Sequence, residues 1–125
     1  MLLGDFFNIS KLEKTDLEIK ADLVINAAHK IFEGHFPGHP VVPGVCMMQM
    51  IKEIMEQVLG KKIDLASAGE MKFLAIIDPQ ENNSIQATIK HHREESGNIV
   101  VAAMLFRDER IHFKFKGLFN FQESF

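Results

Sequence analysis

Residues 43–60 read PGVCMMQMIKEIMEQVLG, and this stretch decides the fold. Pro43 suits the first turn of a helix and Gly60 suits its end, so the sequence predicts one long helix from about 43 to 59. Polar side chains recur at i, i+3, i+4, i+7 and i+8 and form one stripe, which consists of Gln49, Lys52, Glu53, Glu56 and Gln57. The remaining surface is apolar, which predicts that a sheet wraps around this helix.

Short β-type runs flank the helix. Residues 17–30 favour a strand, and four further runs separated by turn residues cover about 63–74, 84–92, 98–107 and 110–121. The connections between these four are too short for crossover helices, so we expect an antiparallel meander. The apolar residues within 1–16 do not recur with a sustained period, which predicts an irregular or partly helical segment. The predicted fold class is therefore α+β, with an antiparallel sheet around one helix.

The composition limits the function. The chain has 125 residues and a net charge of −3, so nucleic acid is a poor candidate ligand. Its single cysteine, Cys46, excludes an internal disulfide and a zinc site of several thiolates, and we expect it to pack in the core. We expect a single domain over 1–125, located in the cytoplasm, without a secretory leader or a membrane span.

The loop before the helix, residues 34–44, contains three Pro and three Gly and cannot form a regular element. It ends at a helix start, where unpaired NH groups and the helix dipole favour an oxyanion or a polarised carbonyl. His35 lies just upstream and could act as a base, although a purely structural role remains open. Pro37 and Gly38 exclude the helix that would bring His35 and His39 onto one metal ion, so we expect no metal and no cofactor.

One motif in this region resembles a known family. Its residues are Phe32-x-Gly34-His35-Phe36-Pro37-Gly38-x-Pro40-x-x-Pro43-Gly44-Val45. The pattern resembles the signature of the 3-hydroxyacyl-[acyl carrier protein] dehydratases of the FabA/FabZ type. The resemblance implies a hot-dog fold and a substrate acyl chain carried as a thioester on acyl carrier protein. It also implies homodimers, or assemblies of dimers, with active sites at the subunit interface.

The resemblance assigns roles to four positions. The family histidine acts on the C2 proton of the substrate, which corresponds to His35, and the glycine NH that binds the thioester carbonyl corresponds to Gly44. The partner subunit's Glu or Asp, which handles the 3-hydroxyl, corresponds to Gln49. A carboxamide is a poor acid, and the Gln that the family commonly has four residues later is here Glu53. Either Glu53 assists or replaces Gln49, or both belong to the solvated stripe.

Three functions follow from these alternatives. The first is dehydration of a (3R)-3-hydroxyacyl chain to the trans-2-enoyl product, in the synthesis of fatty acids or related acyl chains. The second is thioester hydrolysis by a hot-dog protein, with Glu53 as the base that activates water. The third is a non-catalytic subunit that binds acyl carrier protein or pairs with an active dehydratase. The family's aromatic-Pro-Phe-apolar-Asp-Arg segment has no counterpart here, which leaves the acyl chain length open.

Overall fold

The computed structural model describes residues 1–33 and 40–122. Within these residues it contains six strands, one α-helix and one short 3-10 helix. In chain order they are β1 (Phe7–Lys14), β2 (Glu18–Ile25), η1 (Lys30–Phe32), α1 (Gly44–Leu59), β3 (Ile63–Phe73), β4 (Ser84–Arg93), β5 (Ile99–Arg107) and β6 (Arg110–Phe121).

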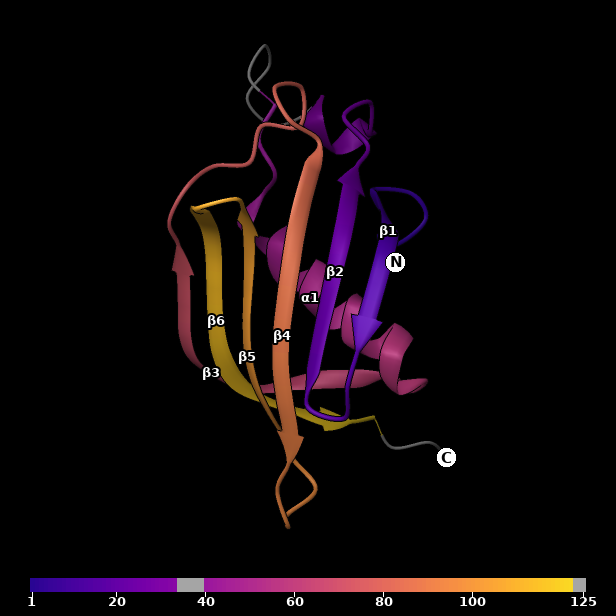
Figure 1. Cartoon of the computed structure of the whole chain (residues 1–125), viewed down its shortest axis with the longest axis vertical. Coiled ribbons are helices and arrows are strands. Elements are labelled where there is room, and N and C mark those ends of the chain that lie inside the picture. Colours follow the sequence, from indigo (N-terminus) through magenta and orange to yellow (C-terminus); the bar gives the residue numbers. More distant parts are fainter. Residues whose placement is uncertain (34–39, 123–125) are drawn as a thin grey trace.

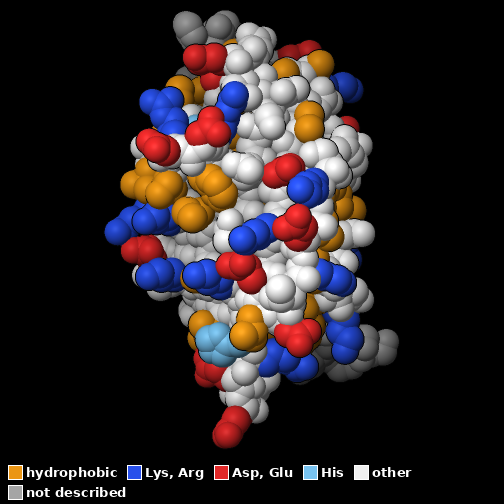
Figure 2. Space-filling model, in the orientation of Figure 1, with side chains coloured by type: hydrophobic (Ala, Val, Ile, Leu, Met, Phe, Trp, Pro, Cys, Tyr) orange, Lys and Arg blue, Asp and Glu red, His pale blue; other side chains and the backbone are white. Residues whose placement is uncertain are grey.

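The strands form one antiparallel sheet in the order β1-β2-β4-β5-β6-β3. Figure 1 shows α1 lying across one face of this sheet, and the lower ends of β3 and β6 bend beneath it. Lys and Arg side chains are interspersed with Asp and Glu over the opposite face (Figure 2). The predicted α+β hot-dog architecture, a sheet curved around one central helix, is therefore confirmed.

The helix has the predicted span. Pro43 is the N-cap residue, with extended backbone, and Gly60 ends the helix in the left-handed conformation at φ 71°. Seven helix residues are buried, and all but Glu53 carry apolar or thiol side chains. These side chains pack with fully buried residues of the sheet and the N-terminal segment, which include Phe6, Phe7, Ile19, Leu23, Phe113, Phe115 and Phe119.

Two predictions about the strands were wrong. Residues 7–14 form β1 rather than an irregular segment, because pairing with β2 supplies the order that their own pattern lacks. Only β4, β5 and β6 form a meander, because residues 74–83 carry the chain across the end of the sheet and leave β3 beside β6. The strand predicted within 17–30 and the spans of the last four runs are confirmed to within a few residues.

Irregular pairing lets the sheet curve. The register shifts once between β1 and β2 and twice between β3 and β6, as β-bulges do where a strand bends. At Gly117 of β6, a Cβ atom would collide with the carbonyl oxygen of Ser67 on β3, so this close approach requires glycine. No helix in the described residues is long and apolar enough to cross a membrane.

Candidate active site

The structure describes three of the four predicted site residues. Gly44, Gln49 and Glu53 all lie on α1, at its first residue and at two positions further along it. His35, the predicted base, lies outside the described residues, as does His39. The geometry of the site is therefore built from the helix and its neighbours.

The start of α1 has no side-chain cap. The NH groups of Cys46 and Met47 donate to the Pro43 carbonyl oxygen at 3.0 and 3.2 Å, so the first intrahelical bonds begin at these residues. Gly44 comes earlier and falls among the NH groups that a helix leaves without an internal partner. Pro43 provides no capping side chain, and no acidic residue lies in the first turn. Within the described residues, this end of the helix therefore offers NH donors and a positive partial charge that suit a ligand oxygen.

The Phe73 ring lies close against Gly44. A Cβ atom on Gly44 would lie 2.8 Å from ring atom Cε1 of Phe73 and 3.0 Å from Cζ. The Phe73 ring also stacks on the Phe113 ring, with centroids 5.0 Å apart. The last residue of β3 therefore packs directly against the helix start.

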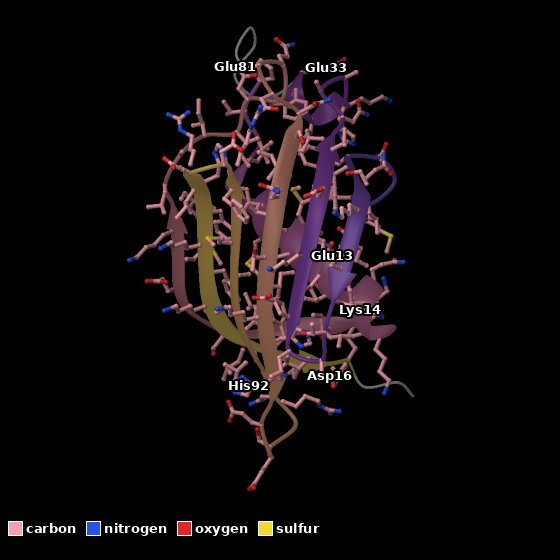
Figure 3. All side chains as sticks on the ribbon, viewed as in Figure 1. Glu13, Lys14, Asp16, Glu33, Glu81 and His92 are labelled. Atoms are coloured by element: carbon pink, nitrogen blue, oxygen red, sulfur yellow. The ribbon has the colours of Figure 1, made fainter. Side chains whose placement is uncertain are left out.

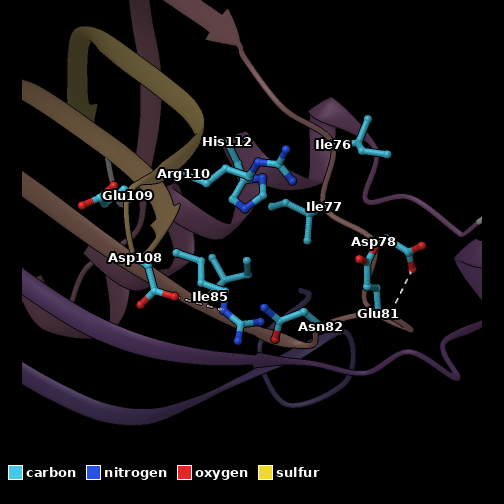
Figure 4. A pocket seen from close by; sticks show the side chains of 11 residues that line it. Ile76, Ile77, Asp78, Glu81, Asn82, Ile85, Asp108, Glu109, Arg110 and His112 are labelled. Carbon is cyan, nitrogen blue, oxygen red and sulfur yellow. Dashed lines mark hydrogen bonds and ion pairs between the residues drawn. The ribbon is translucent and has the colours of Figure 1, made fainter.

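An apolar hollow opens beside this contact. Its volume is ≈ 420 Å³, and it is lined by Val42, Gly44, Met47, Phe73, Leu74, Ala75 and Ile76. Such a lining suits an alkyl or thioester segment placed next to the Gly44 amide. Ile76 also borders a second hollow, ≈ 440 Å³, between the β3–β4 connection and the β5–β6 turn (Figure 4). Charged side chains of both signs surround the second hollow, among them Asp78, Glu81, Asp108, Glu109 and Arg110.

Gln49 and Glu53 contact each other directly. The Gln49 amide nitrogen Nε2 donates to Oε2 of Glu53 at 2.8 Å. Only 2% of Glu53 is exposed, and its carboxylate also accepts hydrogen bonds from the backbone NH groups of Leu2 and Leu3 at 2.8–2.9 Å. The alternative in which Glu53 belongs to a solvated stripe is wrong, because the N-terminal backbone covers it. Leu2 and Leu3 carry no sequence signal for this contact, since only their backbone takes part.

Cys46 lies one turn before Gln49 and faces the core. It is 4% exposed, and burial raises the pKa of its thiol above the ordinary value. A thiol that stays protonated is a weak nucleophile. The prediction that Cys46 packs in the core is confirmed.

Comparison with known proteins places the chain among dehydratases. Residues 11–115 match the model of the ApeI-like family, which is described as ApeI dehydratase. The 3-hydroxyacyl-[acyl-carrier-protein] dehydratase FabZ of Thermus thermophilus is 27% identical over 110 residues, which cover 79% of this chain and 75% of that enzyme. The FabZ of Lactobacillus helveticus is 27% identical over 77 residues, which cover 56% of this chain. The match spans only about half of that relative, 52% of its length.

Solved structures show the same fold. The dehydratase heterocomplex ApeI:P from Xenorhabdus doucetiae has a TM-score of 0.69 at 21% identity, covering 88% of this chain and 95% of that chain. Cj0977, a sigma28-regulated virulence protein from Campylobacter jejuni, has a TM-score of 0.68 at 8% identity. The matched region covers 91% of this chain and 84% of the Cj0977 chain. These structures establish the hot-dog fold, and the family model covers most of the sequence. The chain therefore belongs to the ApeI-like dehydratases, within the FabA/FabZ type of hot-dog proteins.

Proposed function

We propose that the protein removes water from a (3R)-3-hydroxyacyl chain on acyl carrier protein and releases the trans-2-enoyl thioester. The observation that carries this proposal is the helix start at Gly44, which has no side-chain cap and opens on an apolar hollow. A fixed NH donor beside an apolar acyl site is what a developing enolate oxygen needs. The membership in the dehydratase family supports the same reaction.

In the proposed reaction, one histidine removes and returns a single proton, and one amide stabilises the intermediate. His35 takes the C2 proton, and the electron pair of that C–H bond forms the enolate, whose oxygen accepts a hydrogen bond from the Gly44 NH. The enolate then collapses to the C2–C3 double bond, and the C3–O bond breaks with its electron pair on oxygen. The imidazolium of His35 returns the proton to this oxygen, which leaves as water. Gln49 of the partner subunit holds the 3-hydroxyl by a hydrogen bond, and the partner subunit's Glu53 acts through that Gln49.

We further propose that the working unit is a homodimer joined along β3. This edge strand is exposed along nearly its whole length and carries Leu65, Met71 and Phe73 with 42%, 38% and 52% of their area accessible. A long exposed edge strand with several accessible hydrophobic side chains favours pairing with another chain. Since Phe73 packs against Gly44, a second copy on β3 would lie next to the helix start and complete the acyl site.

The test is turnover of purified protein with 3-hydroxyacyl carrier protein, followed as the mass loss of one water. We expect turnover by the unchanged chain and a decrease of at least about 10²-fold in His35→Asn, because a general base is removed. Gln57→Glu, a change at a polar position of the same helix, is the matched control and should keep the rate. Absence of turnover in the unchanged protein, whether it is a monomer or a homodimer in solution, would contradict the proposal.

A second arrangement has one observation in its favour. The similar structure from Xenorhabdus doucetiae is a dehydratase heterocomplex, so a chain of this type can work with a different subunit. Turnover that appears only after a second dehydratase subunit is added would favour this arrangement, and the masses of the separate and mixed proteins would show the complex. Thioester hydrolysis ranks lower, because the carboxylate oxygens of Glu53 already accept hydrogen bonds from Leu2, Leu3 and Gln49.

A further inference from the structure

The N-terminal backbone holds the carboxylate of Glu53. The Leu2 NH donates to both oxygens, at 2.8 and 2.9 Å, and the Leu3 NH donates to Oε1 at 2.8 Å. Both amides belong to a tight turn in which the NH groups of Asp5 and Phe6 donate back to the Leu2 carbonyl at 3.0 and 2.7 Å. Successive NH groups that face one carboxylate form an anion-binding nest.

This turn is itself fixed to the rest of the protein. Gly4 adopts a positive φ of 91° that suits glycine, and its NH donates to the Phe7 carbonyl at 2.8 Å. Phe6 and Phe7 are fully buried, and the side chains of Leu2 and Leu3 pack against the core. The nest therefore has a defined position, and so does the carboxylate inside it.

The fixed carboxylate determines how the Gln49 amide is turned. Both oxygens of Glu53 accept hydrogen bonds from backbone NH groups, and Gln49 Nε2 donates to Oε2, so the NH₂ group of Gln49 faces Glu53. Its carbonyl oxygen Oε1 then points to the other side. The side chain at this helix position consequently presents an acceptor, whereas the family's protonated acid would present a donor.

We propose that Gln49 selects substrates by the group at C3, and that Glu53 is the positioning residue that sets this selection. Oε1 of Gln49 accepts a hydrogen bond from a 3-hydroxyl, while a 3-oxo group has no proton to donate and faces a second acceptor. This inference rests on the proposed function, because that function places Gln49 beside C3. Within the proposed function, it predicts that a 3-hydroxyacyl thioester binds more tightly than a 3-oxoacyl thioester of the same chain length.

The test compares the binding of two acyl-pantetheine thioesters of equal chain length, one 3-hydroxy and one 3-oxo. His35→Asn is the background for every variant, so that the ligands are not consumed. We expect this background to bind the 3-hydroxy ligand about tenfold more tightly than the 3-oxo ligand. This ratio corresponds to the loss of one hydrogen bond when an acceptor faces another acceptor.

Two variants then change Gln49 in opposite ways. In Glu53→Gln, the new amide oxygen faces the Leu2 and Leu3 NH groups, so its NH₂ group donates to Gln49 and the Gln49 amide turns over. Gln49 then presents its NH₂ group, and the preference should reverse toward the 3-oxo ligand. In Gln49→Met, the acceptor is lost while the nest stays intact, so the two ligands should bind about equally.

Glu56→Gln is the matched control, because the Glu56 carboxylate accepts a backbone hydrogen bond from Ile63 at 2.9 Å without contacting Gln49 in the described structure. It should keep the preference of the background. An unchanged preference in Glu53→Gln or in Gln49→Met would overturn the proposal, and Gln49→Met decides it if Glu53→Gln does not fold. A dehydration assay that fails for the unchanged chain contradicts the proposed function instead, since the binding ratio needs no turnover.

Discussion

The two edge strands of the sheet differ in what they expose. At one edge, β1 carries an exposed row of mostly polar side chains, in which Lys11 and Glu13 form an ion pair at 3.4 Å. Figure 3 labels Glu13 and Lys14 along this edge. Leu12, 39% accessible, is the one large hydrophobic residue that β1 exposes. Charged side chains on an edge oppose pairing with another chain.

At the other edge, β3 exposes three large hydrophobic residues, and Leu74 and Ile76 continue the apolar surface beyond its end. The end of β3 also contacts the helix start, through Phe73 and Gly44. The difference supports the proposed homodimer, in which a second copy covers β3 and β1 stays an outer edge of the sheet. In the proposed dimer, the covering of β3 would also complete the acyl site, because Phe73 of β3 lies against Gly44.

The largest effect is expected from a charge on the β3 edge. Met71 and Leu12 are accessible to nearly the same extent, 38% and 39%, so Met71→Glu and Leu12→Glu form a matched pair. We expect Met71→Glu to shift the mass in solution from twice the 14.2 kDa chain toward the single chain. Dehydration should fall by at least about 10²-fold, because a displaced partner removes groups held in reacting geometry.

Leu12→Glu should leave both the mass and the rate unchanged. Light scattering after size exclusion measures the first, and the water-loss assay measures the second. A monomeric unchanged chain, or an equal response of the two variants, would show that the two edges do not differ in the way proposed.

A smaller effect is expected where β3 meets the helix. Gly44→Ala brings a methyl group against the Phe73 ring, and we expect a loss of about 1–2 kcal/mol in the free energy of unfolding. In a Phe73→Ala background the same change should become neutral or slightly stabilising, because alanine favours a helix more than glycine does. Denaturant titrations of the four proteins give the coupling between the sites, which we expect to be about 1 kcal/mol or more. Equal effects of Gly44→Ala in both backgrounds would show that the helix start and the end of β3 are not energetically coupled.

The helix and the long strands could be predicted because their signals are local. Pro43 and Gly60 limit the helix, and alternation along 110–121 reports a sheet with one buried face. The order of the strands is not local. Nothing in residues 63–73 specifies β6 as their neighbour, and β1 depends on pairing with β2 for its order.

The candidate site shows the same division. The sequence predicted that Gly44 lies at the helix start, and comparison with the family pattern showed the exchanged residue types at Gln49 and Glu53. It could not predict that Glu53 is buried, because the groups that satisfy it are backbone amides of Leu2 and Leu3, more than forty positions away along the chain. The contact of Phe73 with Gly44 could not be predicted from the sequence either, since it depends on the path of β3 in the folded sheet.

The smallest effect is expected from an ion pair on β3. Lys72 Nζ lies 3.0 Å from Glu70 Oε1, and this hydrogen bond, with Lys116 and Lys114 adding to the field, lowers the pKa of Glu70 below its usual 4.5. The stabilisation by a lowered carboxyl pKa is present above the unfolded value and is lost as the pH falls through the folded value. Glu70→Gln should therefore lower the melting temperature at pH 7 by about 1 °C or less, since an exposed pair contributes little.

The difference should disappear as the pH falls through the folded pKa of Glu70, and high salt should remove it at pH 7. Thermal melts between pH 7 and pH 3 measure this, with Glu13→Gln at the Lys11 pair on β1 as the comparison. A difference that persists at low pH would mean that Glu70 contributes through packing at the β3 edge. The polar residues of β3 would then stabilise the protein by packing rather than by charge. This would increase the difference between β3 and β1, whose exposed ion pair should respond to pH and salt.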